Sequence, residues 1–181
     1  FYYMASLASD DQLGGGGDND ILMQAVDLLC NSASNMTEQF WTDRYAGINR
    51  ANNAIAVIPN CTGFADNDQK NQMIGEAHFL RAFYYYELAS MYGNIPLVTS
   101  TDQGANNIPQ ASADSIWGQI VYDCKWAADN MPAKSAKAQG LADGHVDKYA
   151  AEALLAREYL FYAGFYKGAN DISSTDISMT L

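Results

Sequence analysis

Residues 75–98 read GEAHFLRAFYYYELASMYGNIPLV, and this stretch constrains the fold more than any other part of the chain. Apolar side chains recur through it at steps of three or four residues, which is the period of an α-helix; they are Ile74, Ala77, Leu80, Tyr84, Leu88 and Met91. A second stripe with the same spacing alternates small residues with rings: Gly75, Phe79, Ala82, Tyr86, Ala89 and Gly93. Two such stripes predict a helix packed on both sides, approached closely by a neighbouring helix.

The sequence also predicts where this helix ends. Gly93 suits a C-terminal cap with positive φ, and Pro96 cannot continue a helix and biases Ile95 toward extended geometry. The three consecutive tyrosines at 84–86 fall inside the helical pattern. We therefore expect their rings to pack between helices and not to form a ligand platform.

Three more segments have helical periodicity. One starts near Thr37 and is ended by Pro59, another is capped by Ser112 or Asp114 and closed by Pro132, and a third runs from about residue 147 to Ala163 and turns at Gly164. Polar, Gly-rich or Pro-rich loops separate them, including LGGGGDND at 13–20 and a small-residue stretch at 133–145. Residues 21–30 form a short apolar segment.

Composition bounds the class of protein. The 181 residues, 49% of them hydrophobic, suffice for one compact domain over 1–181. A net charge of −11 without any Lys/Arg cluster argues against nucleic acid, and no apolar run is long enough to span a membrane. The cysteines Cys30, Cys61 and Cys124 are too widely spaced for a metal framework. We expect Cys124 to be a buried thiol, and a disulfide between two of the three stays open.

An internal repeat suggests the architecture. EAHFLRAFYYY from Glu76 and EALLAREYLFY from Glu152 share the order Glu-Ala-x-x-x-Arg-x-aromatic and start 76 residues apart, roughly two helix-hairpin units. Residues 164–169, GFYKGA, carry the spacing of the turn inside such a unit. The prediction is an all-α, tetratricopeptide-like stack of helical hairpins with long irregular loops.

Three motifs in order carry a family resemblance: W-x-x-x-Y-x-x-I-x-x-A-N at 41–52, G-E-A-x-F-L-R-A-x-Y-Y-x-x-L at 75–88 and Y-G-x-I-P-L-V at 92–98. From about residue 10 to residue 170 the chain resembles SusD/RagB lipoproteins. The resemblance implies a glycan-binding protein on the extracellular face of the outer membrane of Gram-negative bacteria. Such a protein captures oligo- or polysaccharide without cleaving it and passes it to a TonB-dependent, SusC-like transporter. The family's chains are more than twice as long, so we expect this to be the N-terminal portion, without the family's C-terminal portion and lipid-bearing cysteine.

Residues that could suggest catalysis or metal binding have simpler interpretations. Glu76 and Arg81 lie five residues apart, as do Glu152 and Arg157, so on a helix each pair diverges and is expected to form surface or inter-helix ion pairs. Neither histidine, His78 or His145, has a nucleophile motif nearby. We predict no catalytic residue, no cofactor and no enzyme activity.

Two close acidic pairs, Asp18 with Asp20 and Asp66 with Asp68, lack the glycine and glutamate of a calcium-binding loop. They are interpreted as solvated acidic turns, with calcium as a less favoured alternative. No metal site is predicted.

Sugar contacts are expected in loops, where rings can stack on pyranose faces and amides or carboxylates can bond hydroxyls. The suitable loops are 14–20, 31–37 and 60–68, and the candidate ligand-binding residues are Asp18, Asn19, Asp20, Asn35, Phe64 and Asn67. Trp41 and Trp117 lie on apolar stripes and are expected in the core, whereas Trp126 lies off them and is left open. The alternative functions are a helical-repeat adaptor and a peptide-capturing relative; a glycoside hydrolase is less favoured.

Overall fold

The computed structural model describes residues 2–9, 12–13, 17, 19–28, 36–101, 107–142 and 144–166. The helices in these ranges are α1 (Tyr2–Leu7), α2 (Ile21–Asp27), α3 (Met36–Val57), η1 (Ile58–Asn60), α4 (Asn67–Tyr92), α5 (Ala113–Asn130), η2 (Lys137–Gln139) and α6 (Lys148–Tyr166). Within the same ranges, β-structure is limited to the isolated bridge between Pro96 and Gln110. The predicted all-α class is confirmed.

The chain forms two compact units, residues 1–46 and 47–181, and the division falls inside α3. In the first unit α1 and α2 pack against each other. Neither was predicted as a helix, because both are shorter than two turns and show too few periods to be recognised. Asp20 caps α2 by accepting a hydrogen bond from the Met23 amide at 3.4 Å.

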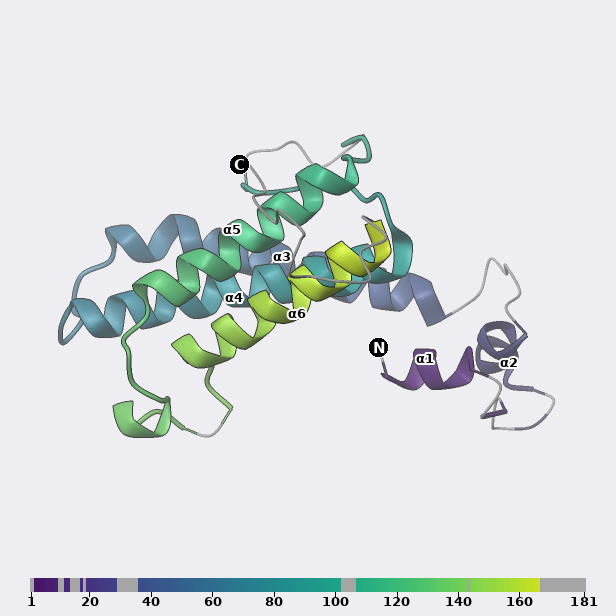
Figure 1. Ribbon diagram of the computed structural model, residues 1–181, viewed down its shortest axis with the longest axis horizontal. Coiled ribbons are helices and arrows are strands. Elements are labelled where there is room, and N and C mark those ends of the chain that lie inside the picture. Colours follow the sequence, from purple (N-terminus) through teal and green to yellow (C-terminus); the bar gives the residue numbers. More distant parts are fainter. Residues whose placement is uncertain are drawn as a thin grey trace. The chain divides into compact units, whose positions relative to one another are not determined.

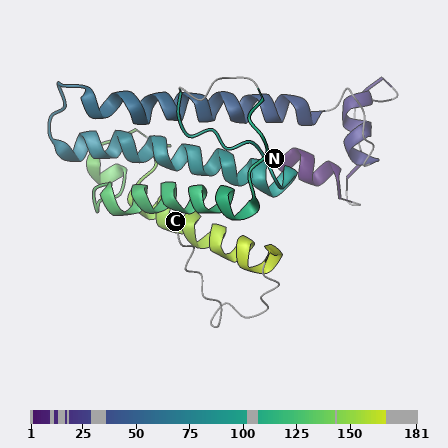
Figure 2. The same cartoon turned by 90° about the horizontal axis from the view of Figure 1, so that it is seen from above.

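In the second unit the C-terminal part of α3 lies beside α4, followed by α5 and then α6, and consecutive helices alternate in direction (Figure 1 and Figure 2). This is the predicted succession of antiparallel hairpins. Two helical glycines permit close approaches: Gly47 of α3 lies against the Tyr84 ring, and Gly75 of α4 lies against the Met131 side chain. A β-carbon at either position would collide with its neighbour, so the small residues do permit close packing.

The tyrosine triplet packs between helices, as the sequence predicted. Tyr85 is fully buried, and Tyr86 meets the fully buried Trp117 edge to face at 5.9 Å. Trp117 in turn stacks on Phe161 of α6, with ring centroids 5.2 Å apart. Rings from α4, α5 and α6 therefore form one aromatic core.

Most predicted helix ends are confirmed. Gly93 ends α4 with φ 71°, and Ser112 caps α5, both as predicted. Asp66, which was not predicted as a cap, accepts from the Gln69 amide at 2.8 Å and caps the start of α4. The turn predicted at Gly164 is wrong, since α6 continues to Tyr166. Two i,i+4 ring pairs span this last turn, Phe161 with Phe165 and Tyr162 with Tyr166, and they favour continuing the helix over breaking it.

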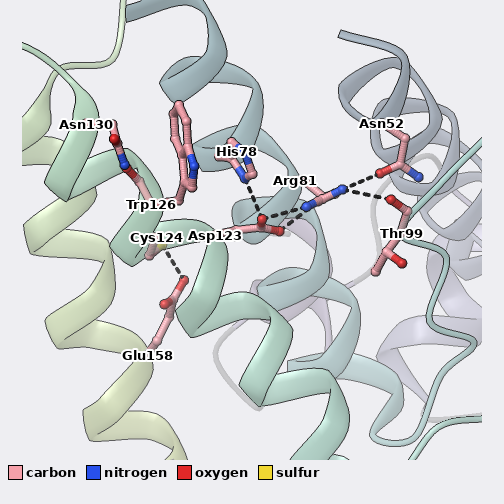
Figure 3. A network of polar contacts seen from close by, with 9 residues as sticks. All are labelled: Asn52, His78, Arg81, Thr99, Asp123, Cys124, Trp126, Asn130 and Glu158. Atoms are coloured by element: carbon pink, nitrogen blue, oxygen red, sulfur yellow. Dashed lines mark hydrogen bonds and ion pairs between the residues drawn. The ribbon is translucent and has the colours of Figure 1, made fainter. Parts of the chain in front are cut away.

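A buried polar network joins three helices and one loop (Figure 3). Arg81 of α4 donates to both carboxylate oxygens of Asp123 of α5, at 2.7 and 2.8 Å. Its other nitrogen donates to the Asn52 side chain of α3 at 2.8 Å and to the Thr99 carbonyl at 3.1 Å. His78 also bonds Asp123, at 2.6 Å. Arg81 is thus in an inter-helix ion pair, as predicted.

The same network fixes the Ile-Pro-Leu-Val segment that follows α4. Tyr85 donates to the Val98 carbonyl at 2.8 Å and accepts from the Val98 amide at 2.7 Å, and Asn52 donates to the Val98 carbonyl at 3.0 Å. The three sequence motifs that carried the family resemblance therefore meet at one buried junction. Their spacing in the sequence is set by this packing.

The predicted equivalence of the two Glu-Arg pairs is not seen. Arg81 is buried, whereas Arg157 is exposed and lies over the Tyr86 ring at 5.5 Å. Glu152 pairs with Lys148 on the surface of α6. The segments that start at Glu76 and Glu152 are therefore both packed helices, but their charged residues have different partners.

Candidate ligand-binding cleft

A cleft of about 560 Å³ opens between the start of α4 and the loop that follows α5. The α4 side contributes Ala65, Asp66, Asp68, Gln69, Gln72, Met73 and Glu76. The loop side contributes Pro132, Lys134, Ala138, Gln139, Leu141 and His145. Its volume lies within the range of about 300–1,000 Å³ typical of small-molecule pockets.

Side-chain hydrogen bonds hold the loop against α4. Gln72 is the centre: its amide nitrogen donates to Glu76 at 2.8 Å and to the Val146 carbonyl at 2.5 Å, and its oxygen accepts from Gln139 at 3.2 Å. His145 bonds the same Glu76 oxygen at 2.8 Å. Because Gln72 is buried, its own three bonds are partly shielded from water and should keep the two walls at a fixed separation, whereas the His145–Glu76 bond is exposed.

The far end of the loop is anchored at α6. One Asp147 oxygen accepts from the Ala150 amide at 3.0 Å and so caps the helix, and the other accepts from the Ala136 amide at 3.1 Å. A single carboxylate thereby ties the loop to the first turn of α6. The cleft is preformed, since each of its walls is attached to a helix.

The lining of the cleft combines polar side chains with a larger apolar surface. Its polar residues include the carboxylates of Asp66, Asp68 and Glu76 and the amides of Gln69 and Gln139. Lys134 approaches Asp68 at 4.0 Å, but both side chains are 62% exposed, so this pair contributes little energy. Carboxylates and amides together can accept from and donate to hydroxyl groups. The cleft is suited to a neutral ligand rich in hydroxyls.

The sequence model of the SusD-like family, described as "Starch-binding associating with outer membrane", matches residues 18–160. The chain belongs to the SusD-like family. It is 30% identical over 163 residues to "SusD-like protein P2" of Formosa agariphila, an alignment that covers 88% of this chain and 31% of that protein.

Solved SusD-like structures share the fold. A "Laminarin binding SusD-like protein" matches with a TM-score of 0.77 and 28% identity, over 89% of this chain and 34% of that one. "Surface glycan-binding protein A from Bacteroides fluxus" matches with a TM-score of 0.73 and 30% identity, over 89% and 35%. The chain thus spans about a third of the length of the SusD-like proteins it matches.

The predicted contact residues of this SusD-like chain lie in several places. Phe64 is half-buried under the Lys70 ammonium, 5.7 Å from its ring centre, and Asn67 is exposed at the first position of α4. Both adjoin Ala65 and Asp66 in sequence, yet neither lines the cleft. Asp68, expected in a loop, lies in the first turn of α4.

The other predicted contacts belong to the first unit or are not described. Asn19 is exposed in a turn, and the Asp20 carboxylate is used to cap α2. Asp18 and Asn35 lie outside the described residues. Of the acidic pair at 18 and 20, Asp20 therefore has a structural role as a helix cap.

Sequence reasoning missed the loop side of the cleft. The sequence pattern points to none of His145, Gln72 and Gln139 as a cleft residue. The bond between His145 and Glu76 joins residues 69 positions apart, and that between Gln139 and Gln72 joins residues 67 apart. No local pattern predicts pairs at such separations; the one usable signal was the run of turn-forming residues at 133–145.

The three tryptophans have different environments. Trp117 is fully buried, as predicted. Trp41 is half-buried with its ring 4.8 Å from that of Tyr45, so it is less buried than expected. Trp126 is half-buried and stacks on His78 with ring centroids 4.3 Å apart.

One buried acid lies outside the cleft. Glu158 of α6 is fully buried, and its desolvation raises its pKa to about 8 although the Cys124 thiol donates to one of its oxygens at 3.2 Å. Burial and the neighbouring Glu158 raise the pKa of Cys124 as well, so this thiol stays protonated and unreactive. The expected burial of Cys124 is confirmed.

In the part of the chain that the structure describes, no three His, Cys, Asp or Glu residues are grouped as metal ligands. No helix in that part is long and apolar enough to cross a membrane.

Proposed function

We propose that the protein captures a glycan on the extracellular face of the outer membrane and passes it to a TonB-dependent transporter. Membership in a family described as starch-binding and associated with the outer membrane supports the ligand class and the location. The similar solved structures include a laminarin-binding protein and a surface glycan-binding protein. Attachment would be through a lipid on an N-terminal cysteine, as the family resemblance implies.

The observation that carries the proposal in this chain is the cleft at the start of α4. Its walls are fixed by Gln72 and Asp147, so a ligand would pay little to order them. Its lining offers hydrogen-bond donors and acceptors without a strong positive charge, which matches a neutral oligosaccharide. The predicted contacts Phe64 and Asn67 are sequence neighbours of the lining residues Ala65, Asp66 and Asp68. In the proposed site they would add contacts to the same ligand.

The geometry favours capture over cleavage. A glycosidase needs one carboxylic acid held protonated beside the scissile bond and a second carboxylate across from it. In the cleft, Asp66 is used as a helix cap and Glu76 is bonded by both His145 and Gln72. Glu158, whose pKa is raised, is fully buried and does not line the cleft.

Calorimetric titration of the full-length gene product with oligosaccharides of laminarin and starch tests this site. Replacing Gln139 by Ala and His145 by Ala, singly, should each weaken binding by about three- to tenfold, because each change removes one hydrogen-bonding group worth about 0.5–1.5 kcal/mol. Gln119→Ala, in α5 and outside the cleft lining, is the matched control.

Undiminished binding by both cleft variants would place the glycan elsewhere in the protein. Absence of binding by the unaltered protein would favour the peptide-capturing or adaptor alternatives. The apolar side chains of Met73, Pro132 and Leu141 in the cleft lining would then receive a peptide side chain.

A further inference from the structure

A second, smaller hollow lies on α5 and shares no lining residue with the cleft. It has a volume of about 220 Å³ and is lined by Tyr122, Lys125, Trp126, Asp129 and Asn130. These positions recur at steps of three, one, three and one, so they form a single face of the helix. Tyr122 is 42% exposed and Trp126 is half-buried, which leaves aromatic surface in contact with solvent.

The Trp126 ring is held in place from below. It stacks on His78 with centroids 4.3 Å apart and an angle of 19° between the ring planes. His78 is buried and bonds Asp123 at 2.6 Å, and Asp123 is bonded twice by Arg81. Figure 3 shows this order, with Trp126 between His78 and Asn130. The buried network therefore orders an aromatic ring that is partly exposed, at no further cost on binding.

The rim of the hollow supplies polar groups beside the rings. The Asn130 amide nitrogen donates to the Trp126 carbonyl at 2.9 Å, which fixes the side chain and leaves its oxygen available to accept. Lys125 and Asp129, both exposed, add one donor and one acceptor of opposite charge. An apolar ring face surrounded by mixed donors and acceptors is complementary to a pyranose, which has an apolar face and a hydroxyl edge.

We propose that this hollow, defined by Tyr122, Trp126 and Asn130, is a second sugar subsite, in which one pyranose of a longer glycan stacks on Trp126. The inference rests on the proposed function, because it names another contact for the same ligand. The hollow is smaller than the roughly 300 Å³ at the lower end of ordinary ligand pockets. It therefore takes a single ring of a polymer that is bound elsewhere as well, and short fragments should use it weakly.

The test uses the full-length gene product in native gels that contain laminarin or soluble starch. Trp126→Ala should weaken retardation about three- to tenfold, because it removes the ring on which the pyranose would stack. Trp126→Phe keeps a ring on His78 and should keep most of the retardation, which separates loss of stacking from loss of folding. Tyr149→Ala, a 50% exposed aromatic of α6 that lies outside the hollow, should behave as wild type.

A second readout reports on the ring itself. In protein labelled with ¹⁵N at tryptophan, the indole signal that disappears in Trp126→Phe should shift when a laminarin oligosaccharide is added. Retardation of the wild type together with unchanged Trp126→Ala retardation and an unmoved indole signal would overturn the subsite and leave the proposed function standing. Failure of either polymer to retard the wild type would overturn both.

Discussion

Arg81 and Asp123 form two parallel hydrogen bonds, at 2.7 and 2.8 Å, between the middle of α4 and the middle of α5, with both side chains out of solvent. Such a bidentate pair is directional, so it fixes the register of one helix against the other. The pair also makes two further contacts. Arg81 bonds Asn52, which holds the segment after α4, and Asp123 bonds His78, on which the Trp126 ring stacks.

Replacing Arg81 should destabilise the fold strongly. In Arg81→Ala the buried Asp123 carboxylate keeps His78 as a partner but loses both bonds from Arg81, and we expect a loss of about 3–5 kcal/mol in the free energy of unfolding. Urea unfolding measures this. Glu152→Ala, which removes the exposed i,i+4 pair with Lys148, should cost less than about 0.5 kcal/mol. Similar losses in the two variants would contradict the role given to the buried pair.

Glu158 should make stability depend on pH. Its pKa is raised from 4.5 to about 8 in the folded chain, so the folded state binds the proton more tightly than the unfolded state does. Its contribution to stability is therefore fully present below about pH 4.5 and is lost as the pH rises toward 8, by up to about 1.4 kcal/mol per pH unit.

Glu158→Gln isolates this contribution. The amide cannot ionise, so the difference in unfolding free energy between variant and wild type should grow in favour of the variant from pH 5 to pH 8. Denaturant unfolding at several pH values gives this difference, with Glu152→Gln as the exposed control. A pH-independent difference would show that Glu158 is not protonated in the fold.

Tyr85 should hold the segment after α4. Tyr85→Phe removes both hydrogen bonds to Val98 and leaves that amide without its partner, at a cost of about 1–3 kcal/mol. Hydrogen exchange of the Val98 amide should become faster, while amides in the middle of α5 stay protected. Tyr122→Phe, which changes an exposed hydroxyl, is the control. Unchanged exchange at Val98 would contradict the assigned role.

Two glycines in helices should respond in opposite directions. Gly75→Ala places a methyl group against Met131 and should destabilise the protein by about 1–3 kcal/mol, because the helices must separate or the methionine must move. Gly164→Ala meets nothing within 4 Å and should stabilise α6 by about 0.5–1 kcal/mol. Thermal unfolding of the pair measures both; equal shifts would refute the close helix contact at Gly75.

The helices could be predicted because the information is local. The periodicity around Gly75, the proline after Gly93 and the cap at Ser112 all act within a few residues, and the structure confirms the elements they predicted. The helices α1 and α2 were not predicted, because they are too short for a periodic pattern to repeat. Gly164 predicted a turn, but the helix continues past it, and the i,i+4 ring pairs that form only in the helix favour this continuation.

The partners of charged residues could not be predicted. Arg81 and Asp123 are 42 positions apart, and Glu76 and His145 are 69 apart, so only the stacked helices reveal them. The loop at 60–68 was selected by its composition, and residues 65, 66 and 68 do line the cleft. Which of its side chains line the cleft depends on where α4 begins, and that start, after the cap at Asp66, was not predicted.

The central claim is capture of a glycan without cleavage, and affinity electrophoresis of the full-length gene product tests it most directly. The gels would contain soluble starch, laminarin or xyloglucan, and the chain length of each polymer would be measured after incubation with the protein. We expect retardation by at least one polymer whose length distribution is unchanged. Migration unaffected by every polymer, or shortening of the polymer that is bound, would contradict the account.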